Sequence, residues 1–425
     1  MIKIEISGLM GRTTPLNVSF DPDHNFFVGQ NGTGKTTVIN LLAATLLCDF
    51  EKLEKISFEN VKVYLLNDNG KPVVISVEKT KGDDNLVTDV SYSVEAEGKV
   101  STFDLDEYGI QMRARAAHSP AIRRQLFKHH VVNAKSLVSK YVNARWLSIN
   151  RASESMENSP DGRHLPAIDR KLQELTNEIA KYFGRLSKSY ADKTTDFQQT
   201  SLLSVIRSES KFTFERFLKE IDIEAEQEAL KHAFDALGMP EIRYSATLRN
   251  HFQDLNKSIG VVSGRDGESY HFDEVYSIYN GWKVHNLVNE YKKLEQEKVR
   301  IFKPRDTFIS TINSLFQPRK EVKVSARNEL TVGVMNGKIF KEIDFSDLSS
   351  GEKQLLIILG EALLQESSSV IYIADEPELS LHVRWQTKIT GSIKAINPKA
   401  QIIFATHSPD IVNIHSDNII DMELA

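Results

Sequence analysis

The sequence predicts an α/β protein with a mixed sheet, an antiparallel β lobe and a large helical insertion. Apolar and polar residues alternate with a period of two through most of the first 110 residues, as in "KIEIS" and "VVISVEK", which is typical of strands. From about Ala167 to Phe316 apolar residues recur at spacings of three and four, as they do in helices. The last hundred residues read as strand and helix in alternation, which indicates a parallel sheet.

The helical stretch is expected to divide one α/β head into two halves. We place the N-terminal half at residues 1–152, the insertion at 153–320 and the C-terminal half at 321–425. Pro240 and Pro304 are expected to break helices, because proline removes a backbone donor and clashes with the preceding turn. No heptad register persists over several turns, so we expect a compact helical lobe and not a long coiled coil.

The first chemical motif lies in "FFVGQNGTGKTT", where an apolar strand leads into a glycine-rich turn and an apolar helix. The turn fills the spacing G-x-x-x-x-G-K-[ST] of a P-loop. Backbone N–H groups wrap a phosphate only where no Cβ intrudes, and the positive end of the helix then faces the anion. We expect Lys35 at the β and γ phosphates of a nucleotide and Thr36 at Mg²⁺. The residues expected to bind the nucleotide are Asn31, Gly32, Gly34, Lys35, Thr36 and Thr37.

Two further apolar strands deliver polar side chains at their carboxyl ends. Val370 to Ala374 is followed by Asp375 and Glu376, and "QIIFA" is followed by His407 after one threonine. Phosphate hydrolysis needs a carboxylate on magnesium and a group that orients or deprotonates the attacking water. We therefore assign Asp375 to the metal and Glu376 to catalysis, and we expect His407 near the γ-phosphate, because parallel sheets place ligands at this edge. Solvated acids and a structural histidine are the alternatives.

A third candidate lies between the insertion and these strands, in "DLSSGEKQLLIILGEALL". Ser349 to Glu352 form an S-x-x-E capping box at the start of an apolar helix, which is a sufficient structural explanation. A helix N-terminus with serine, glycine and little side-chain bulk is also a ready phosphate site. The residues alone leave both interpretations open.

Composition excludes several classes of protein. With 425 residues and 40% hydrophobic content, the chain can bury a large core. No apolar run approaches the roughly 20 residues that span a bilayer, so we expect no membrane partner. The single cysteine, Cys48, excludes a disulfide framework and a C-x-x-C zinc hook and predicts a cytoplasmic protein. The formal net charge of -5 argues against a protein coated in nucleic acid, although a local basic patch remains compatible with it.

Taken in order, "GQNGTGKTT", "LSSGEKQ", "VIYIADEPE" and "ATHS" resemble the ABC-type ATPase heads of the SMC, RecF and OLD group. The resemblance covers roughly residues 1–110 and 320–425, and it implies an ABC-ATPase-like head with a large helical insertion. It implies that Ser349, Ser350 and Gly351 form the signature motif, which contacts the γ-phosphate held by the P-loop of another subunit. ATP and Mg²⁺ would then join two heads in a homo-oligomer.

The same resemblance implies two further elements. Glu378 to His382, "ELSLH", occupies the place of the D-loop, which lies at the seam between heads. A glutamine that senses Mg²⁺ is expected between the P-loop and the signature, and Gln111 is one candidate.

Departures from neighbouring families narrow the implied function. Transporter heads carry a stricter L-S-G-G-Q, DNA-tethering members need long coiled coils, and OLD nucleases continue well past the position of His407. The chain is instead similar to ATPase subunits of bacterial anti-phage systems, such as AriA of PARIS and PtuA of Septu, and its length favours AriA. This implies an ATP-hydrolysing switch that senses an invader signal and holds or releases a separate toxin or nuclease effector. The alternative is a RecF-like or SMC-like DNA-binding repair ATPase.

A basic segment, Gln111 to Arg151, contains nine Lys or Arg residues, three His and no Asp or Glu. In a protein of net charge -5 this asymmetry predicts a positive surface that attracts nucleic acid or an acidic phage trigger protein. The alternative is that these side chains pair with acids of the helical lobe or line the nucleotide site.

Overall fold

The computed structural model describes residues 1–67, 69–81, 88–104, 132–147, 166–206, 214–263, 271–337, 339–412 and 416–423. The chain divides into two compact units. The head unit comprises Met1–Lys181 and Pro304–Ala425, and the helical unit comprises Tyr182–Lys303. The boundaries expected at residues 152 and 320 stay predictions. Among the described residues, no helix combines the length and the hydropathy needed to cross a membrane.

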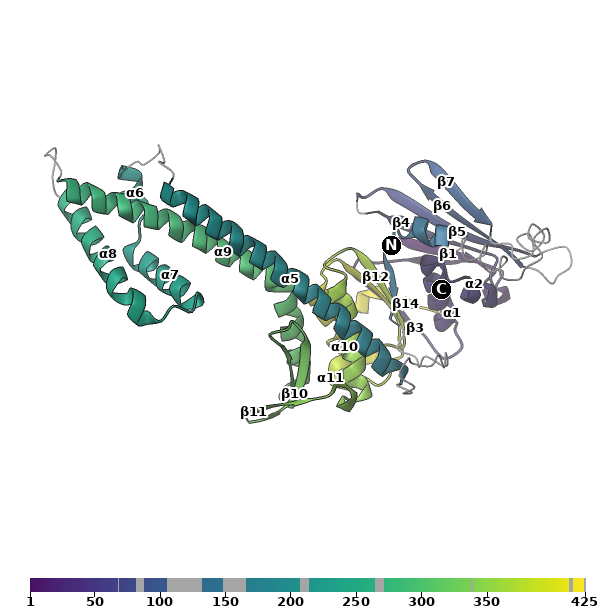
Figure 1. The fold of residues 1–425 in the computed structure, drawn as a ribbon. Coiled ribbons are helices and arrows are strands. Elements are labelled where there is room, and N and C mark those ends of the chain that lie inside the picture. The colour runs from purple at the N-terminus through teal and green to yellow at the C-terminus, as the bar shows by residue number, and fades with distance from the viewer. Residues whose placement is uncertain are drawn as a thin grey trace, which may run out of the picture. The chain divides into compact units, whose positions relative to one another are not determined.

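A five-stranded parallel sheet forms the centre of the head unit (Figure 1). Its order is β14-β3-β13-β12-β8, and each neighbouring pair is parallel. Because the strands are parallel, their carboxyl ends meet at one edge, where the turns after β3, β12 and β13 leave the sheet. The strands are β3 (His24–Val28), β8 (Ala144–Trp146), β12 (Val370–Asp375), β13 (Ala400–Ala405) and β14 (Ile419–Asp421).

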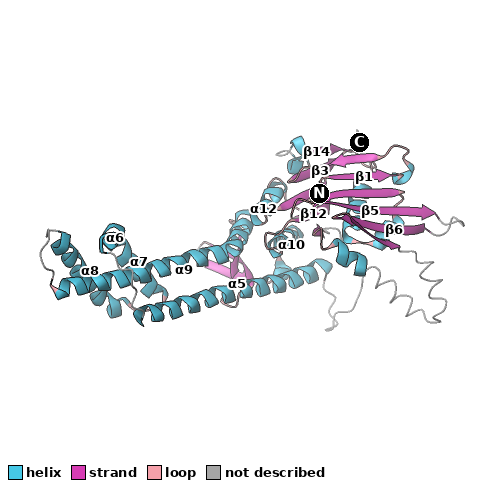
Figure 2. Cartoon of the chain, turned by 90° about the horizontal axis from the view of Figure 1, so that it is seen from above, coloured by secondary structure: helices cyan, strands magenta, loops and turns pink. Residues whose placement is uncertain are grey.

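A six-stranded antiparallel sheet, of order β2-β1-β4-β5-β6-β7, forms the predicted β lobe (Figure 2). Alternate residues are buried along its strands, as at Val61, Val63 and Leu65 of β4, so one face packs on the core. The strands are β1 (Lys3–Ser7), β2 (Leu16–Ser19), β4 (Asn60–Leu66), β5 (Pro72–Lys81), β6 (Thr88–Ala96) and β7 (Lys99–Asp104).

Helix α1 (Lys35–Leu47) links the two sheets into one core. It contacts β8, β12 and β13 of the parallel sheet. From the antiparallel sheet, the buried hydroxyl of Tyr92 donates a hydrogen bond to the carbonyl oxygen of Thr45 in this helix. Residues of both sheets and of α1 belong to a single hydrophobic cluster. Burial on both sides thus fixes the helix that begins at Lys35, and α2 (Phe50–Lys55) follows it.

Helix α10 (Ser350–Leu364), which begins at the predicted signature, is among the remaining elements of the head unit. A three-stranded antiparallel sheet of order β11-β10-β9 precedes this helix, which packs on α12. The predicted α/β head with an antiparallel lobe and a helical insertion is confirmed, although the described strands of its P-loop sheet are all parallel and not mixed as expected. The other elements are η1 (Leu9–Gly11), a helical stretch at 132–138, β9 (Lys320–Val324), β10 (Leu330–Asn336), β11 (Ile339–Ile343), η2 (Phe345–Asp347), α11 (Val383–Gln386), α12 (Ile389–Ile396), α13 (Pro409–Val412) and η3 (Ser416–Asn418).

The helical unit contains the adjacent parts of two long helices, which lie side by side in Figures 1 and 2. Tyr190 and Phe197 of the first helix make edge contacts with Phe302 and Tyr291 of the second. Shorter helices pack against the second one through a separate hydrophobic cluster. The helices are α5 (Ala167–Ile206), α6 (Phe214–Glu220), α7 (Ile223–Ala236), α8 (Glu241–Ser263) and α9 (Phe272–Phe316).

The expectation that Pro304 breaks a helix is wrong. Helix α9 runs for 45 residues with Pro304 inside it, and α5 runs for 40 residues. Proline removes one N–H donor and crowds the preceding turn, but buried apolar residues on both sides, such as Val288 and Phe308, keep the helix packed. The division between the two units falls at Pro304. At Pro240 the expectation is confirmed, because α7 ends before it and α8 begins after it.

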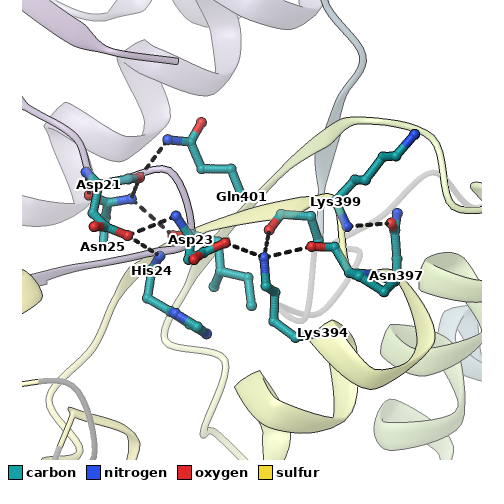
Figure 3. Close-up of polar contacts among 11 residues, drawn as sticks. Asp21, Asp23, His24, Asn25, Lys394, Asn397, Lys399 and Gln401 are labelled. Carbon is teal, nitrogen blue, oxygen red and sulfur yellow. Dashed lines mark hydrogen bonds and ion pairs between the residues drawn. The ribbon is translucent and has the colours of Figure 1, made fainter. Parts of the chain in front are cut away.

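A polar cluster ties together the segments that lead into β3 and β13 (Figure 3). The Asp21 carboxylate accepts hydrogen bonds from the backbone N–H of Asp23 and His24, at 2.7 and 3.1 Å. The Gln401 side chain donates to the Asp21 carbonyl at 2.7 Å, and Lys394 donates to the Asp23 carboxylate. These contacts fix the amino ends of β3 and β13, so they help to set the register in which the two strands reach the opposite edge.

Candidate nucleotide site

The predicted P-loop is the turn between β3 and α1. Gly29, Gly32 and Gly34 have φ values of 143°, 87° and 96°, a region that glycine occupies without strain. A Cβ on Gly32 or Gly34 would meet nothing within 4 Å, so the backbone conformation explains glycine at these two positions. Asn31 and Gly32 lie exposed at the tip of the turn, where their N–H groups are accessible to an anion.

Lys35 reaches back across this turn from the first residue of α1. Its Nζ donates hydrogen bonds to the carbonyl oxygens of Gly29 and Gln30, at 2.7 and 2.9 Å. The residue is only 5% exposed. The ammonium group therefore lies inside the turn that would surround a phosphate.

The two predicted magnesium ligands meet in space. The Thr36 hydroxyl donates a hydrogen bond to Oδ1 of Asp375 at 3.2 Å, although the residues lie on α1 and β12. Mg²⁺ prefers oxygen ligands and usually takes one or two from protein and the rest from phosphates and water. The described residues contain no group of three or more His, Cys, Asp or Glu arranged to hold a metal. The two oxygen ligands of Thr36 and Asp375 match the number that Mg²⁺ takes from protein when phosphates and water supply the rest.

The predicted catalytic residues also lie together, at the ends of β12 and β13. Nε2 of His407 is 3.4 Å from Oε1 of Glu376, and the His407 side chain is 42% exposed. The backbone N–H of Glu376 donates to the carbonyl of Ala405 at 2.8 Å. Glu376 has a φ of 52°, a left-handed conformation that is uncommon outside glycine and is concentrated at functional sites.

Negative charge is concentrated at this edge. Burial, followed by the neighbouring carboxyl groups of Glu378 and Asp375, raises the pKa of Glu376 to about 7, against the opposing effect of Lys35. Burial also raises the pKa of Asp375, whereas the hydrogen bond from Thr36 lowers it. A bound cation would relieve the repulsion among these carboxylates. Neighbouring carboxylates of this kind are expected at a magnesium site.

The predicted capping box is present at the start of α10. Oγ of Ser349 accepts from the N–H of Glu352 at 3.4 Å, and Oε2 of Glu352 accepts from the N–H of Ser349 at 2.7 Å. Lys320 donates to the same Oε2 at 2.7 Å. The structural interpretation of this motif is therefore confirmed. Ser349 and Ser350 are nevertheless exposed, so a second role at phosphate stays a prediction.

The signature helix packs against the segment that follows Glu376. A Cβ on Gly351 would lie 2.3 Å from the carbonyl oxygen of Ser380, so only glycine permits this approach. The Gln354 side chain donates a hydrogen bond to the carbonyl of Pro377 at 3.0 Å. The structure thus joins the predicted signature to the predicted D-loop segment of the same chain.

Glu378 has a role in this site that the sequence did not reveal. Sequence analysis placed it only at the start of the D-loop segment, whereas the structure shows a buried acid bound to the loop after β13. The one available signal was a third acid close behind Asp375 and Glu376 in "DEPE".

Some predicted residues lie outside the described part of the chain. Gln111 is one of them, as are 111–131 and 148–151 of the basic segment. Of the nine cations in that segment, Lys135, Lys140 and Arg145 are described, and all three are exposed. The predicted binding surface therefore stays a prediction.

Two solved SMC heads are similar to this chain at low identity. One is the Smc head domain with an extended coiled coil bound to the C-terminal domain of ScpA, derived from Pyrococcus furiosus. It is 13% identical, with 97% of this chain and 90% of that chain covered and a TM-score of 0.38. The other is an SMC head bound to the C-winged helix domain of ScpA. It is 12% identical, with the same coverage and a TM-score of 0.37.

Curated relatives and a family match complete the comparison. The chain is 22% identical over 409 residues to a probable ATPase of retron Vc95 from Vibrio cholerae serotype O1 biovar El Tor, covering 92% of this chain and 67% of that protein. It is 30% identical over 159 residues to the Septu protein PtuA of Bacillus thuringiensis, covering 33% of this chain and 38% of that protein. Residues 1–412 match the AAA ATPase domain family. The chain therefore belongs to the AAA ATPase domain family.

Proposed function

We propose that this chain is an ATP-hydrolysing switch of anti-phage defence, which senses an invader signal and holds or releases a separate toxin or nuclease effector. The observation that carries the proposal is the meeting of the P-loop, Asp375, Glu376 and His407 at one sheet edge. Membership of an ATPase family supports the nucleotide chemistry. The defence role is supported by similarity to a retron ATPase and to a Septu protein. Whether AriA is the nearer relative, as length suggests, stays a prediction.

Each residue has a distinct part in the proposed reaction. The P-loop amides and Lys35 bind the phosphates, and Thr36 and Asp375 would hold Mg²⁺. The ion, when bound, neutralises phosphate charge as it develops. Glu376 orients or deprotonates the attacking water, and His407 contacts the γ-phosphate.

We further propose that ATP joins two heads. Support comes from the exposed N-terminus of α10, where Ser349 and Ser350 are accessible to a phosphate held by another chain. Leu379 and Val383, in and just after the predicted D-loop segment, are exposed apolar residues and suit a surface that another subunit covers.

The nucleotide site is tested first by Lys35→Ala. The variant loses the cation held inside the P-loop, so ATP binding is expected to be abolished. Nucleotide affinity is measured with a fluorescent ATP analogue, and thermal unfolding controls for folding. An affinity within about twofold of the wild type, equivalent to ~0.4 kcal/mol, would remove the basis for the P-loop assignment.

The two-head geometry is tested by mixing inactive chains. Ser349→Arg places bulk and charge where the helix would meet the γ-phosphate, so this variant is expected to lack turnover. Mixed with Lys35→Ala, it is expected to regain activity, because one seam then pairs an intact P-loop with an intact signature. Failure of every mixture, despite verified subunit exchange, would count against this geometry.

The effector part is tested in cells and in solution. We expect phage protection only when the chain is produced with the products of its neighbouring genes, and we expect Lys35→Ala to abolish it. Tight, salt-dependent DNA binding by the isolated chain, with no partner required for its activity, would favour the RecF-like repair ATPase instead.

A further inference from the structure

Glu378 is a buried acid to which the proposed reaction gives no part. It is 8% exposed and lies in the segment between β12 and α11. Its Oε1 accepts three hydrogen bonds from consecutive residues of the loop after β13. The donors are Oγ1 of Thr406 at 2.6 Å, the N–H of His407 at 2.8 Å and the N–H of Ser408 at 3.0 Å.

These contacts fix the backbone from which His407 projects. Hydrogen bonds to a carboxylate are stronger than those between neutral groups, and burial strengthens them further. The His407 side chain itself remains accessible, and its ring nitrogen lies 3.4 Å from Glu376. The position of the imidazole therefore depends on a loop whose donors converge on one oxygen of Glu378.

Glu378 is itself held from the other side. Its carbonyl oxygen accepts from the N–H of Leu381 at 2.8 Å. The preceding carbonyl, of Pro377, accepts from Gln354 of the signature helix at 3.0 Å. A carboxylate on a segment anchored in this way has little freedom to follow the loop if the loop moves.

We propose that Glu378 is a positioning residue that holds His407 beside Glu376 at the γ-phosphate. This inference rests on the proposed ATP hydrolysis. Glu378 acts on His407 through the backbone of residues 406–408, and its carboxyl group also lies beside Glu376. We therefore expect it to affect the rate of the chemical step and not the binding of the nucleotide. All three loop contacts use Oε1, while Oε2 is buried without a hydrogen-bond partner. An oxygen acceptor at the Oε1 position is therefore the property that the role requires.

Two substitutions of Glu378 separate this role from a structural one. Glu378→Ala removes the acceptor, so kcat is expected to fall by about 100-fold, as for a catalytic group displaced by roughly an ångström. The affinity for ATP is expected to stay within about twofold of the wild type. Glu378→Gln keeps an oxygen acceptor but removes the charge beside Glu376, so its kcat is expected to fall much less than that of the Ala variant, by at most about tenfold. A Gln variant as slow as the Ala variant would overturn the proposal, because the charge and not the acceptor would then matter.

A double-mutant cycle tests whether Glu378 acts through His407. If it does, Glu378→Ala causes no further loss of kcat in a His407→Ala background. If the separate losses of kcat multiply in the double variant, the two residues act independently and the proposal is overturned. Thr406→Val, which removes one donor to the same oxygen, is the milder variant if Glu378→Ala does not fold, and it is expected to lower kcat without changing ATP affinity. An unchanged kcat for Thr406→Val would likewise count against the proposal that Glu378 positions His407 through this loop.

Glu361→Gln is the matched control. Glu361 is a partly buried acid of α10 that pairs with Lys171 at 2.6 Å, and the variant is expected to keep wild-type kcat. A wild-type chain that binds ATP but does not hydrolyse it overturns the proposed function and this inference together. A wild-type chain that hydrolyses ATP, alongside a Glu378→Ala variant of normal kcat, overturns this inference alone.

Discussion

The acidic side chains of the two units have different surroundings. In the helical unit, Glu226 is 2% exposed and bonds to Nδ1 of His285, whose Nε2 accepts from Asn289 at 2.9 Å. Burial raises the pKa of Glu226, and the bond to His285 lowers it. The chain itself thus supplies a partner for this acid.

At the sheet edge of the head unit, acidic residues gather beside one another instead. Asp375, Glu376 and Glu378 interact unfavourably, and the ammonium of Lys35 bonds to backbone carbonyls. An acid paired with a single histidine inside a helical unit suits a structural role, whereas several acids that raise one another's pKa mark a candidate functional site. The comparison therefore predicts a structural role for Glu226 and ligand chemistry for Glu376. Substitutions of these two residues test it, and Gly351→Ala tests the packing of the signature helix.

The largest expected effect comes from Glu376→Gln. ATP turnover is expected to fall by about 10²- to 10⁴-fold, because the group that orients or deprotonates water is lost, while ATP binding is retained. The metal-free chain is expected to unfold at a higher temperature, because one of three neighbouring acids is neutralised. Turnover, nucleotide affinity and thermal unfolding check these outcomes. Normal turnover would place the catalytic group elsewhere, and a lower unfolding temperature would give Glu376 a structural role.

A smaller effect is expected from Gly351→Ala at the signature. The new Cβ would lie 2.3 Å from the Ser380 carbonyl, so the helix must shift, at a cost of about 1–3 kcal/mol in the free energy of unfolding. Turnover is expected to fall with it, because the start of α10 moves. Denaturant unfolding and ATPase assays measure both.

Gly391→Ala is the matched control for this substitution. Gly391 lies inside α12, and a Cβ there meets nothing within 4 Å. The variant is expected to gain about 0.5–1 kcal/mol, because alanine suits a helix interior better than glycine. A Gly351→Ala chain as stable as this control would mean that the contact between α10 and the D-loop segment is loose.

The candidate nucleotide site was predictable to the extent that its motifs are local in sequence. The P-loop backbone needs glycine at fixed positions, so the spacing of Gly32 and Gly34 predicts this turn from the sequence alone. Glu376 and His407 follow apolar strands, and the rule that parallel strands share a carboxyl edge predicts that they lie together, as they do. The capping box was also predictable from the sequence, because its two partners, Ser349 and Glu352, are three residues apart.

Features that depend on distant segments were not predictable. Glu378 has no local signal for its contacts, which exist only because the loop after β13 packs beside it. Strand β8 has three residues and shows no periodicity of its own, and its pairing with β12 places it in the sheet. At Pro304 the local rule was overridden by the packing of a long helix.

The smallest expected effect on ATP turnover, and the sharpest check of the comparison, comes from Glu226→Ala. Removing the acceptor leaves Nδ1 of buried His285 without its partner, which is expected to cost about 1–3 kcal/mol in the free energy of unfolding. Glu226→Gln keeps an oxygen there and is expected to cost less. ATP turnover at 25 °C is expected to stay within about twofold of the wild type, because Glu226 lies in the helical unit and the nucleotide residues lie in the head unit. Unfolding followed by circular dichroism, with exposed Glu228→Ala as the control, measures the cost. Unchanged stability together with reduced turnover would reverse the assignment, because the buried pair would then be a functional element and not a support of the fold.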